Sequence, residues 1–398
     1  MNSGRRIFLE IADLLGVEQR FAGAGLRFDI GALYPQTGTG ALYGDHIGDV
    51  PSLACRHVAA MGGPKFNLIM RDNRTGDPQA GASAISEFGL ANVPMLLSSY
   101  SANFGMLLPE IERYKIFTID GGGGAPLYAQ GKPYFWGSIA TTPNDALAGV
   151  IAFVQNTMPG VAKYSSIGWK LGPYANEHIL DAKRYFEDAG LVLVAAQRVK
   201  IGTTEYSAPL RAMRASECDV VFCNLYGEDV GYFMKQYAAS GIGKPVIAFT
   251  HSRAAQCIAG PAYDGLYFAC DYFDPERPAN PWAAFYLEEF RELEGRGVPA
   301  DSYGANTYED IFALWACVRR VLAKNGNPHD GAQLDAALRD DPTFPSLYGG
   351  TAETVGTLRF DLTTHSVVRR PMTIARVEGD RIVPHARFES GRPAFELV

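Results

Sequence analysis

The stretch "MLLSSYSANFGMLLPEIERYKIFTIDGGGG", residues 95–124, predicts a strand, a helix and a second strand. Two short apolar runs have the length of buried strands, and the apolar spacing of residues 104–114 between them is that of a helix. In such a unit the two strands are parallel, so their carboxyl ends meet at one edge of the sheet. Both ends are polar or glycine-rich, because Ser98–Ser101 follows the first strand and Asp120–Gly124 follows the second.

The same alternation of strands and helices extends over most of the chain. A first series starts with the strand at 26–33, and a second starts near Trp136. The predicted strands are 66–70, 94–97, 116–119, 164–169, 191–197, 218–223, 245–249 and 264–273, and the predicted helices are 41–60, 77–88, 104–114, 143–157, 175–188, 205–215, 228–240 and 303–324. Residues 357–362, 367–375 and 381–383 have the pattern of antiparallel strands, with a turn at 378–380. The predicted fold class is therefore α/β, with two lobes that each contain a doubly wound parallel sheet.

The composition is that of a soluble globular chain with more than one core. The 398 residues are too many for one ordinary core, so two lobes are expected. The formal net charge is -7, with 36 Lys and Arg against 43 Asp and Glu. Since phosphate binding requires a basic surface, this charge argues against a nucleic-acid partner.

The six cysteines indicate neither zinc nor dithiol chemistry, because none forms a C-x-x-C pair. Cys218 and Cys223 lie an odd number of positions apart on one predicted strand, so their side chains should face opposite sides of the sheet. A disulfide between Cys257 and Cys270 stays open, because spacing in the sequence does not determine geometry.

Two interpretations of the N-terminus stay open. Arg5 and Arg6 before an apolar residue, with a small-residue stretch at 22–24, are typical of a twin-arginine export signal. Charged residues interrupt the intervening segment, and this favours a short, partly buried amphipathic helix instead. No other window has the run of about 20 apolar residues that a membrane span requires.

The polar ends of the strands predict a binding site. Hydroxyl groups and bare backbone N–H groups beside a helix N-terminus can bind a carboxylate or an amide oxygen. Taken alone, the serines at 98–101 are more typical of helix caps, and the glycines at 121–124 could form a plain loop. Their coincidence at neighbouring strand ends leaves a binding site and these alternatives equally open. In the second series Tyr174, Tyr226 and His251 follow strands in the same way, although each alone is typical of a partly buried side chain.

The chain lacks the sequence signals of common enzymes. It contains no G-x-S-x-G, H-E-x-x-H or P-loop motif, and Pro245 after 241–244 prevents the helix start that a P-loop requires. The seven histidines have no metal-ligand spacing, and the glycine run is not a dinucleotide fingerprint. We therefore predict that the protein is not an enzyme and uses no cofactor and no metal.

The chain resembles the periplasmic solute-binding proteins of branched-chain amino-acid and amide ABC importers. The resemblance covers nearly all of residues 26–398 and is carried by the order of loose motifs: "DIGALYPQTGTGALYG", "MLLSSYSANFGMLLPEIERYKIFTIDGGGGAP", "FWGSIATTPNDALAG", "DVVFCNLYGEDVGYFMKQYAASGIGKPVIAF", "AYDGLYFACDYF" and "TVGTLRFD". It implies a type I periplasmic-binding-protein fold, with two lobes joined by three hinge crossovers and a ligand in the interlobe cleft.

The resemblance also implies domain boundaries and partners. Lobe 1 would hold 26–139 and 272–345, lobe 2 would hold 140–270 and 350–398, and residues 1–25 would stand before them. The partners would be a small-molecule ligand and the membrane permease of an ABC importer, without insertion into the membrane. The closed, liganded state would be the one that the permease recognises.

The site residues follow position by position from the resemblance. Ser101 matches a carboxylate-binding serine and, with its neighbours Ser99 and Tyr100, forms one side of the predicted site. Gly122 and Gly124 match positions whose backbone carbonyl and amide contact the ligand, although the family often has threonine where Gly124 stands. The aromatic members of the predicted site are Tyr43 at the cleft mouth and Tyr174 and Tyr226 on the second lobe.

His251 is the main departure from the family pattern. Amino-acid-binding members tend to have an acidic residue there, which pairs with the ammonium group of the ligand. A histidine does this poorly, so either Glu228 or Asp229 compensates or the ligand lacks an α-amine. The ligand classes that stay open are branched-chain or other amino acids, small or aromatic carboxylic acids, and amides.

Three functions therefore compete. The first is a periplasmic binding protein for import. The second is a cytosolic amide- or acid-responsive sensor on the same fold, and the third is a nucleotide-dependent α/β enzyme. Removal of residues 1–24 from the mature protein would favour export, whereas their retention would favour the cytoplasmic sensor.

Overall fold

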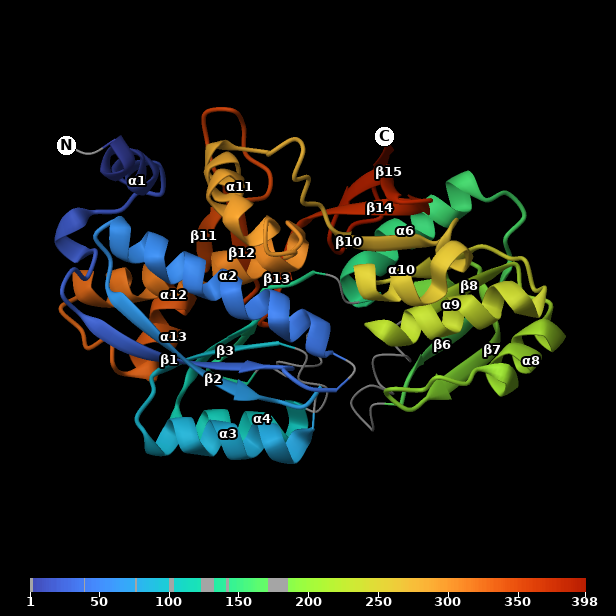
Figure 1. Ribbon diagram of the computed structural model, residues 1–398, viewed down its shortest axis with the longest axis horizontal. Coiled ribbons are helices and arrows are strands. Elements are labelled where there is room, and N and C mark those ends of the chain that lie inside the picture. Colours follow the sequence, from blue (N-terminus) through green and yellow to red (C-terminus); the bar gives the residue numbers. More distant parts are fainter. Residues whose placement is uncertain are drawn as a thin grey trace. The chain divides into compact units, whose positions relative to one another are not determined.

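The computed structural model describes residues 3–38, 40–75, 77–99, 104–122, 132–140, 143–170 and 185–398. The chain forms two compact units (Figure 1). Unit 1 contains Met1–Thr37, Ala41–Ile139 and Phe273–Val368, and unit 2 consists mainly of Ala140–Tyr272 and Arg369–Val398. The chain thus passes between the units three times, as the predicted fold class requires.

Unit 1 contains a parallel sheet of five strands in the order β2-β1-β3-β4-β5. Helices α3 and α4 pack together on one face, and α2, α12 and α13 cover the other (Figure 1). The strands are β1 (Arg27–Tyr34), β2 (Lys65–Asp72), β3 (Met95–Ser98), β4 (Phe117–Asp120) and β5 (Phe135–Gly137). The helices are α1 (Ser3–Leu14), η1 (Gln19–Phe21), α2 (Ala41–Ala60), α3 (Pro78–Leu90), α4 (Phe104–Tyr114), α11 (Pro281–Glu294), α12 (Ser302–Ala323) and α13 (Gly331–Asp340).

Unit 2 contains an eight-stranded mixed sheet in the order β16-β15-β14-β10-β9-β8-β6-β7. Its strands are β6 (Lys163–Trp169), β7 (Val192–Val199), β8 (Val220–Asn224), β9 (Val246–Ala248), β10 (Tyr267–Asp271), β14 (Pro371–Glu378), β15 (Arg381–Glu389) and β16 (Phe395–Leu397). Its helices are α6 (Pro143–Thr157), α8 (Ser207–Ser216), α9 (Glu228–Ser240), α10 (Arg253–Ala259) and η2 (Gly260–Tyr263). The predicted antiparallel tail is confirmed, because β14 and β15 form a hairpin at Gly379.

Short polar residues set several helix starts. The carboxylate of Asp77 accepts hydrogen bonds from Gln79 N and Ala80 N at the start of α3, where Pro78 is the first helical residue. Asn280 and Pro281 start α11 in the same way. Such caps satisfy N–H groups that a helix end otherwise leaves without partners, and each is worth about 1 kcal/mol.

Two expectations from the sequence need correction, and one question that the sequence left open is answered. Residues 350–368, expected in lobe 2, belong to unit 1, because β11 (Thr343–Ser346), β12 (Gly356–Phe360) and β13 (Val367–Val368) form one antiparallel sheet. The strand expected at 367–375 is interrupted, since Arg369 has a φ of 56° and ends β13. Cys257 and Cys270 are both free.

The N-terminal segment packs onto unit 1 as a helix and a following turn. Ala12 and Ala22 are fully buried, and Trp315 Nε1 of α12 donates a hydrogen bond of 2.7 Å to the carbonyl oxygen of Ala22. The Phe8 ring lies edge-on to Phe285 of α11, with 5.4 Å between centroids. The segment therefore extends the core of unit 1. None of the helices in the described part of the chain combines the length and apolar character that a bilayer crossing requires.

One buried carboxylate joins the three places where the chain enters or leaves unit 2. Asp271 Oδ1 accepts a hydrogen bond of 3.3 Å from Ala140 N, and Asp271 Oδ2 lies 3.2 Å from Arg370 Nε. All three residues are at most 2% exposed. Because a buried charge is costly without partners, this ion pair holds the three segments in one arrangement.

We expect Asp271→Asn to lower the free energy of unfolding by about 3 kcal/mol, because the buried Arg370 guanidinium loses the charge opposite it. Urea unfolding followed by circular dichroism measures this. The matched control is Asp380→Asn, whose carboxylate is 94% exposed beside Arg253 and whose loss should change stability by less than about 0.5 kcal/mol. Equal effects of the two substitutions would contradict the role of Asp271.

Candidate functional site

The carboxyl ends of β3 and β4 lie side by side in unit 1, as expected. Ser98 and Asp120 are paired in register, and Gly121 N donates a hydrogen bond of 2.9 Å to Ser98 O. The described members of the two predicted polar stretches, Ser98–Ser99 and Gly121–Gly122, therefore meet at one edge of the sheet.

Asp120 organises this edge. Its side chain is fully buried, Ser98 Oγ donates a hydrogen bond to its Oδ2, and Gly122 N donates one of 2.9 Å to its Oδ1. Ser138 N donates to its backbone oxygen at 2.9 Å, so the turn after β4 is tied to the end of β5. The amide hydrogen of Gly122 is thus already donated to Asp120.

A second buried carboxylate explains one of the glycines. Asp310 of α12 is 2% exposed, and a Cβ atom on residue 121 would lie only 3.0 Å from Asp310 Oδ2. A side chain at 121 would therefore press on this carboxylate, which would have to shift by a few tenths of an ångström. Burial, with Asp310 and Asp120 nearby, raises the pKa of Tyr34 well above its usual range. The sequence interpretation missed Asp310, although an acid within the apolar stripe of a helix is a usable signal.

Ser99 contributes its backbone to the edge. Its side chain is buried, its N–H donates to Leu33 O at 3.2 Å, and its carbonyl oxygen accepts a hydrogen bond of 2.6 Å from Asn73 Nδ2. Of the other predicted residues, Tyr100, Ser101, Gly124 and Tyr174 lie outside the described residues. Tyr43 lies near the start of α2, and its side chain is likewise outside the description.

The corresponding edge of unit 2 is formed around Asp229. This residue is fully buried at the second position of α9, and its Oδ2 accepts hydrogen bonds from Trp169 Nε1 at 2.8 Å and Gly202 N at 2.9 Å. Burial raises the pKa of Asp229 to about 6. The half-buried Tyr226, one of the predicted ligand contacts, lies 5.3 Å from Trp169 between ring centroids. Trp169 was missed, although it ends a predicted strand.

His251 follows β9 at the same edge. Its ring stacks on Phe268 with 4.8 Å between centroids and an interplanar angle of 22°. Burial, with a smaller effect of Arg253, lowers the pKa of His251 to about 4, so the imidazole is neutral at pH 7. Among the described residues its Nδ1 is buried without a hydrogen-bond partner, and so is Asn224 Oδ1 at the end of β8.

The strand-end edge of unit 2 carries few charged groups. Unit 2 presents neutral hydrogen-bonding atoms, aromatic rings and one carboxylate that two donors already orient. Buried polar atoms without partners cost about 1–3 kcal/mol each. At this edge the described residues leave His251 Nδ1, Asn224 Oδ1 and Asp229 Oδ1 without a partner. Within the described residues no group of acidic, histidine or cysteine side chains could hold a metal ion.

The low pKa of His251 predicts a pH dependence of stability. The unfolded imidazole binds a proton near pH 6.5, whereas the folded one does so only near pH 4. Stability from this residue is therefore complete above pH 6.5 and is lost as the pH falls toward 4, by about 3 kcal/mol in all.

We expect His251→Gln to remove this loss. Between pH 8 and pH 4.5 the urea midpoint of the unaltered protein should fall relative to that of the variant, because only the unaltered protein loses the stability that the neutral His251 contributes. A difference that is constant between these pH values would show that the imidazole is not buried in its neutral form.

Comparisons with known proteins agree with this architecture. The sequence model of the periplasmic binding protein family matches residues 28–381. The Leu/Ile/Val-binding protein homolog 1 of Brucella suis biovar 1 is 23% identical over 330 residues, which are 80% of this chain and 84% of the relative.

Among solved structures, a leucine-binding protein from Thermotoga maritima has a TM-score of 0.77 at 16% identity and covers 91% of this chain and 99% of its own. A solute-binding protein from R. palustris in complex with benzoate has a TM-score of 0.74 at 20% identity and covers 94% of this chain and 97% of its own. These structures show the fold, and the expected type I architecture is confirmed. Because the family match spans most of the sequence, this chain belongs to the periplasmic binding protein family, whose relatives named here are solute-binding proteins.

Proposed function

We propose that this protein is the solute-binding component of an ABC importer and binds a small carboxylic acid or amide that lacks a charged α-amine. The observation that carries the proposal is the neutral, half-buried His251, whose buried Nδ1 has no hydrogen-bond partner among the described residues. A carboxylate at this position would pair with an ammonium group, whereas a neutral imidazole forms a hydrogen bond with an uncharged or anionic group. Burying an ammonium without an opposite charge costs several kcal/mol.

The remaining groups would complete recognition from both units. The hydroxyl of Ser101 and the backbone at Gly122 and Gly124 would hold the head group of the ligand, and Tyr226 and Trp169 would contact its body. Tyr43 and Tyr174 remain proposed contacts on the family pattern. Two structural neighbours from R. palustris contain benzoate and 4-hydroxybenzoate, which supports an acid without an amine as the ligand class. The permease of the importer would recognise the liganded form.

The test uses pairs of ligands that differ only in the amine. We expect 4-methylpentanoate to bind at least about tenfold more tightly than leucine, and 3-phenylpropanoate more tightly than phenylalanine, because 1.4 kcal/mol corresponds to a factor of ten. Titration calorimetry on ligand-stripped protein measures both pairs. Tighter binding of the amino acid in both pairs, or no binding of any of the four, would refute the proposed ligand class.

His251 variants supply the control for this experiment. His251→Glu restores a carboxylate and should shift the preference toward the amino acid, whereas His251→Gln stays neutral and should keep the preference for the acid. If neither variant changes the ratio of affinities within a pair, then His251 does not face the ligand.

One observation favours the second candidate, a cytosolic sensor on the same fold. The segment up to Ala22 packs on unit 1, where Trp315 Nε1 donates to Ala22 O at 2.7 Å and Arg319 Nη1 donates to Gly16 O at 3.0 Å. Removal of this segment as an export leader would leave the indole N–H of a buried tryptophan without its partner.

The intact mass of the protein from its native host, measured separately in periplasmic and cytoplasmic fractions, decides between the candidates. A periplasmic form without residues 1–24 supports the importer component. A cytoplasmic form that retains them, and that binds the same ligand, supports the sensor.

A further inference from the structure

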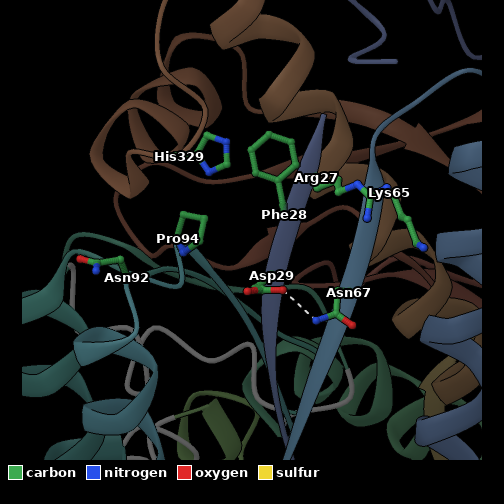
Figure 2. A pocket seen from close by; sticks show the side chains of 8 residues that line it. All are labelled: Arg27, Phe28, Asp29, Lys65, Asn67, Asn92, Pro94 and His329. Atoms are coloured by element: carbon green, nitrogen blue, oxygen red, sulfur yellow. Dashed lines mark hydrogen bonds between the residues drawn. The ribbon is translucent and has the colours of Figure 1, made fainter. Parts of the chain in front are cut away.

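Unit 1 has a cavity at the edge of its sheet opposite the proposed ligand site. It has a volume of about 350 Å³ and lies where β1, β2 and β3 begin (Figure 2). Small-molecule sites in proteins start at about this size. In a parallel sheet the amino and carboxyl ends of the strands lie at opposite edges, so this cavity is separate from the groups around Asp120 and Gly122.

Two cations occupy neighbouring positions in the cavity wall. Arg27 of β1 and Lys65 of β2 are partners in the register of the parallel strands, and both side chains are exposed. In the described part of the chain neither side chain forms an ion pair or a hydrogen bond. Like charges at paired positions on adjacent strands repel each other, and a bound anion would relieve this repulsion.

The lining contains one carboxylate, and it is already engaged. Asp29 lies two residues after Arg27 on the same face of β1, and Asn67 Nδ2 donates a hydrogen bond of 2.7 Å to its Oδ1 (Figure 2). Two cations and one carboxylate leave a single excess positive charge in the wall. This balance fits an anion of charge −1 better than a di- or trianion.

An aromatic pair forms another part of the wall. The rings of Phe28 and His329 lie 4.5 Å apart between centroids and are tilted by 34°, and Figure 2 shows them together beside the cavity. Phe28 is 2% exposed, whereas the imidazole of His329 is exposed. A planar or apolar ligand body can pack against such rings while its charged end stays near the cations.

We propose that this cavity is a second binding site of unit 1, for a small organic monoanion whose carboxylate lies between Arg27 and Lys65 and whose body contacts the exposed ring of His329, which packs on Phe28. The site is independent of the solute site proposed above, because it lies at the other edge of the sheet and contains none of the same residues. The chemistry that it recognises is a carboxylate attached to a planar body.

Acetylation footprinting tests the proposal at the level of single residues. The protein is treated with an acetylating reagent in the presence of benzoate, benzamide or inorganic phosphate, and the modification rate of each lysine is measured by mass spectrometry. We expect benzoate to slow the modification of Lys65 but not that of the exposed Lys235 in unit 2, whereas the uncharged benzamide should protect neither.

Matched arginine variants complete the experiment. Arg27→Gln should weaken the protection of Lys65 by benzoate by about tenfold, the usual effect of losing one charge-assisted contact. Arg211→Gln, on the exposed surface of unit 2, should leave the protection unchanged. Equal protection by phosphate or by benzamide, or full protection in the Arg27 variant, would overturn the assignment. His251 variants should not alter the protection of Lys65 by benzoate. Failure of the second-site proposal is therefore distinguishable from failure of the proposed solute-binding function.

Discussion

The buried carboxylate of Asp271 is the constraint that ties together the three segments through which the chain enters and leaves unit 2. It holds Ala140 and Arg370, so that all three segments leading into unit 2 are anchored to one group at the end of β10. A charge in this position is stable only while its partners stay in place.

Two buried acids contact the start of the glycine run. The carboxylate of Asp120 accepts a hydrogen bond from the amide of Gly122, and Asp310 Oδ2 would lie 3.0 Å from a Cβ atom at 121. Close approach of the backbone to another group is one of the few reasons to place glycine after a strand. For Gly121 that group is a carboxylate of the protein itself.

At the strand ends of unit 2, burial shifts the pKa values of two side chains, Asp229 and His251. Asp229 is held by Trp169 and Gly202, and its environment raises its pKa, whereas the environment of His251 lowers the pKa of the imidazole. Both shifts have the same cause, since burial disfavours the charged form of either residue. The proposed preference for ligands without an ammonium group follows from this low-charge environment together with the absence of an acid at position 251.

The sequence by itself determined the two α/β lobes, most helix and strand positions, the antiparallel tail and the family, because these depend on local periodicity and on the order of motifs along the chain. It also predicted that the ends of β3 and β4 lie together, since that follows from parallel topology. Only the tertiary structure decided which groups face those ends. Asp310 reaches Gly121 from a helix far along the chain, β12 and β13 complete a sheet of unit 1, and Cys257 and Cys270 stay free. Each of these three features depends on packing between segments that are distant in the sequence. Local residue patterns do not specify which distant segments pack together.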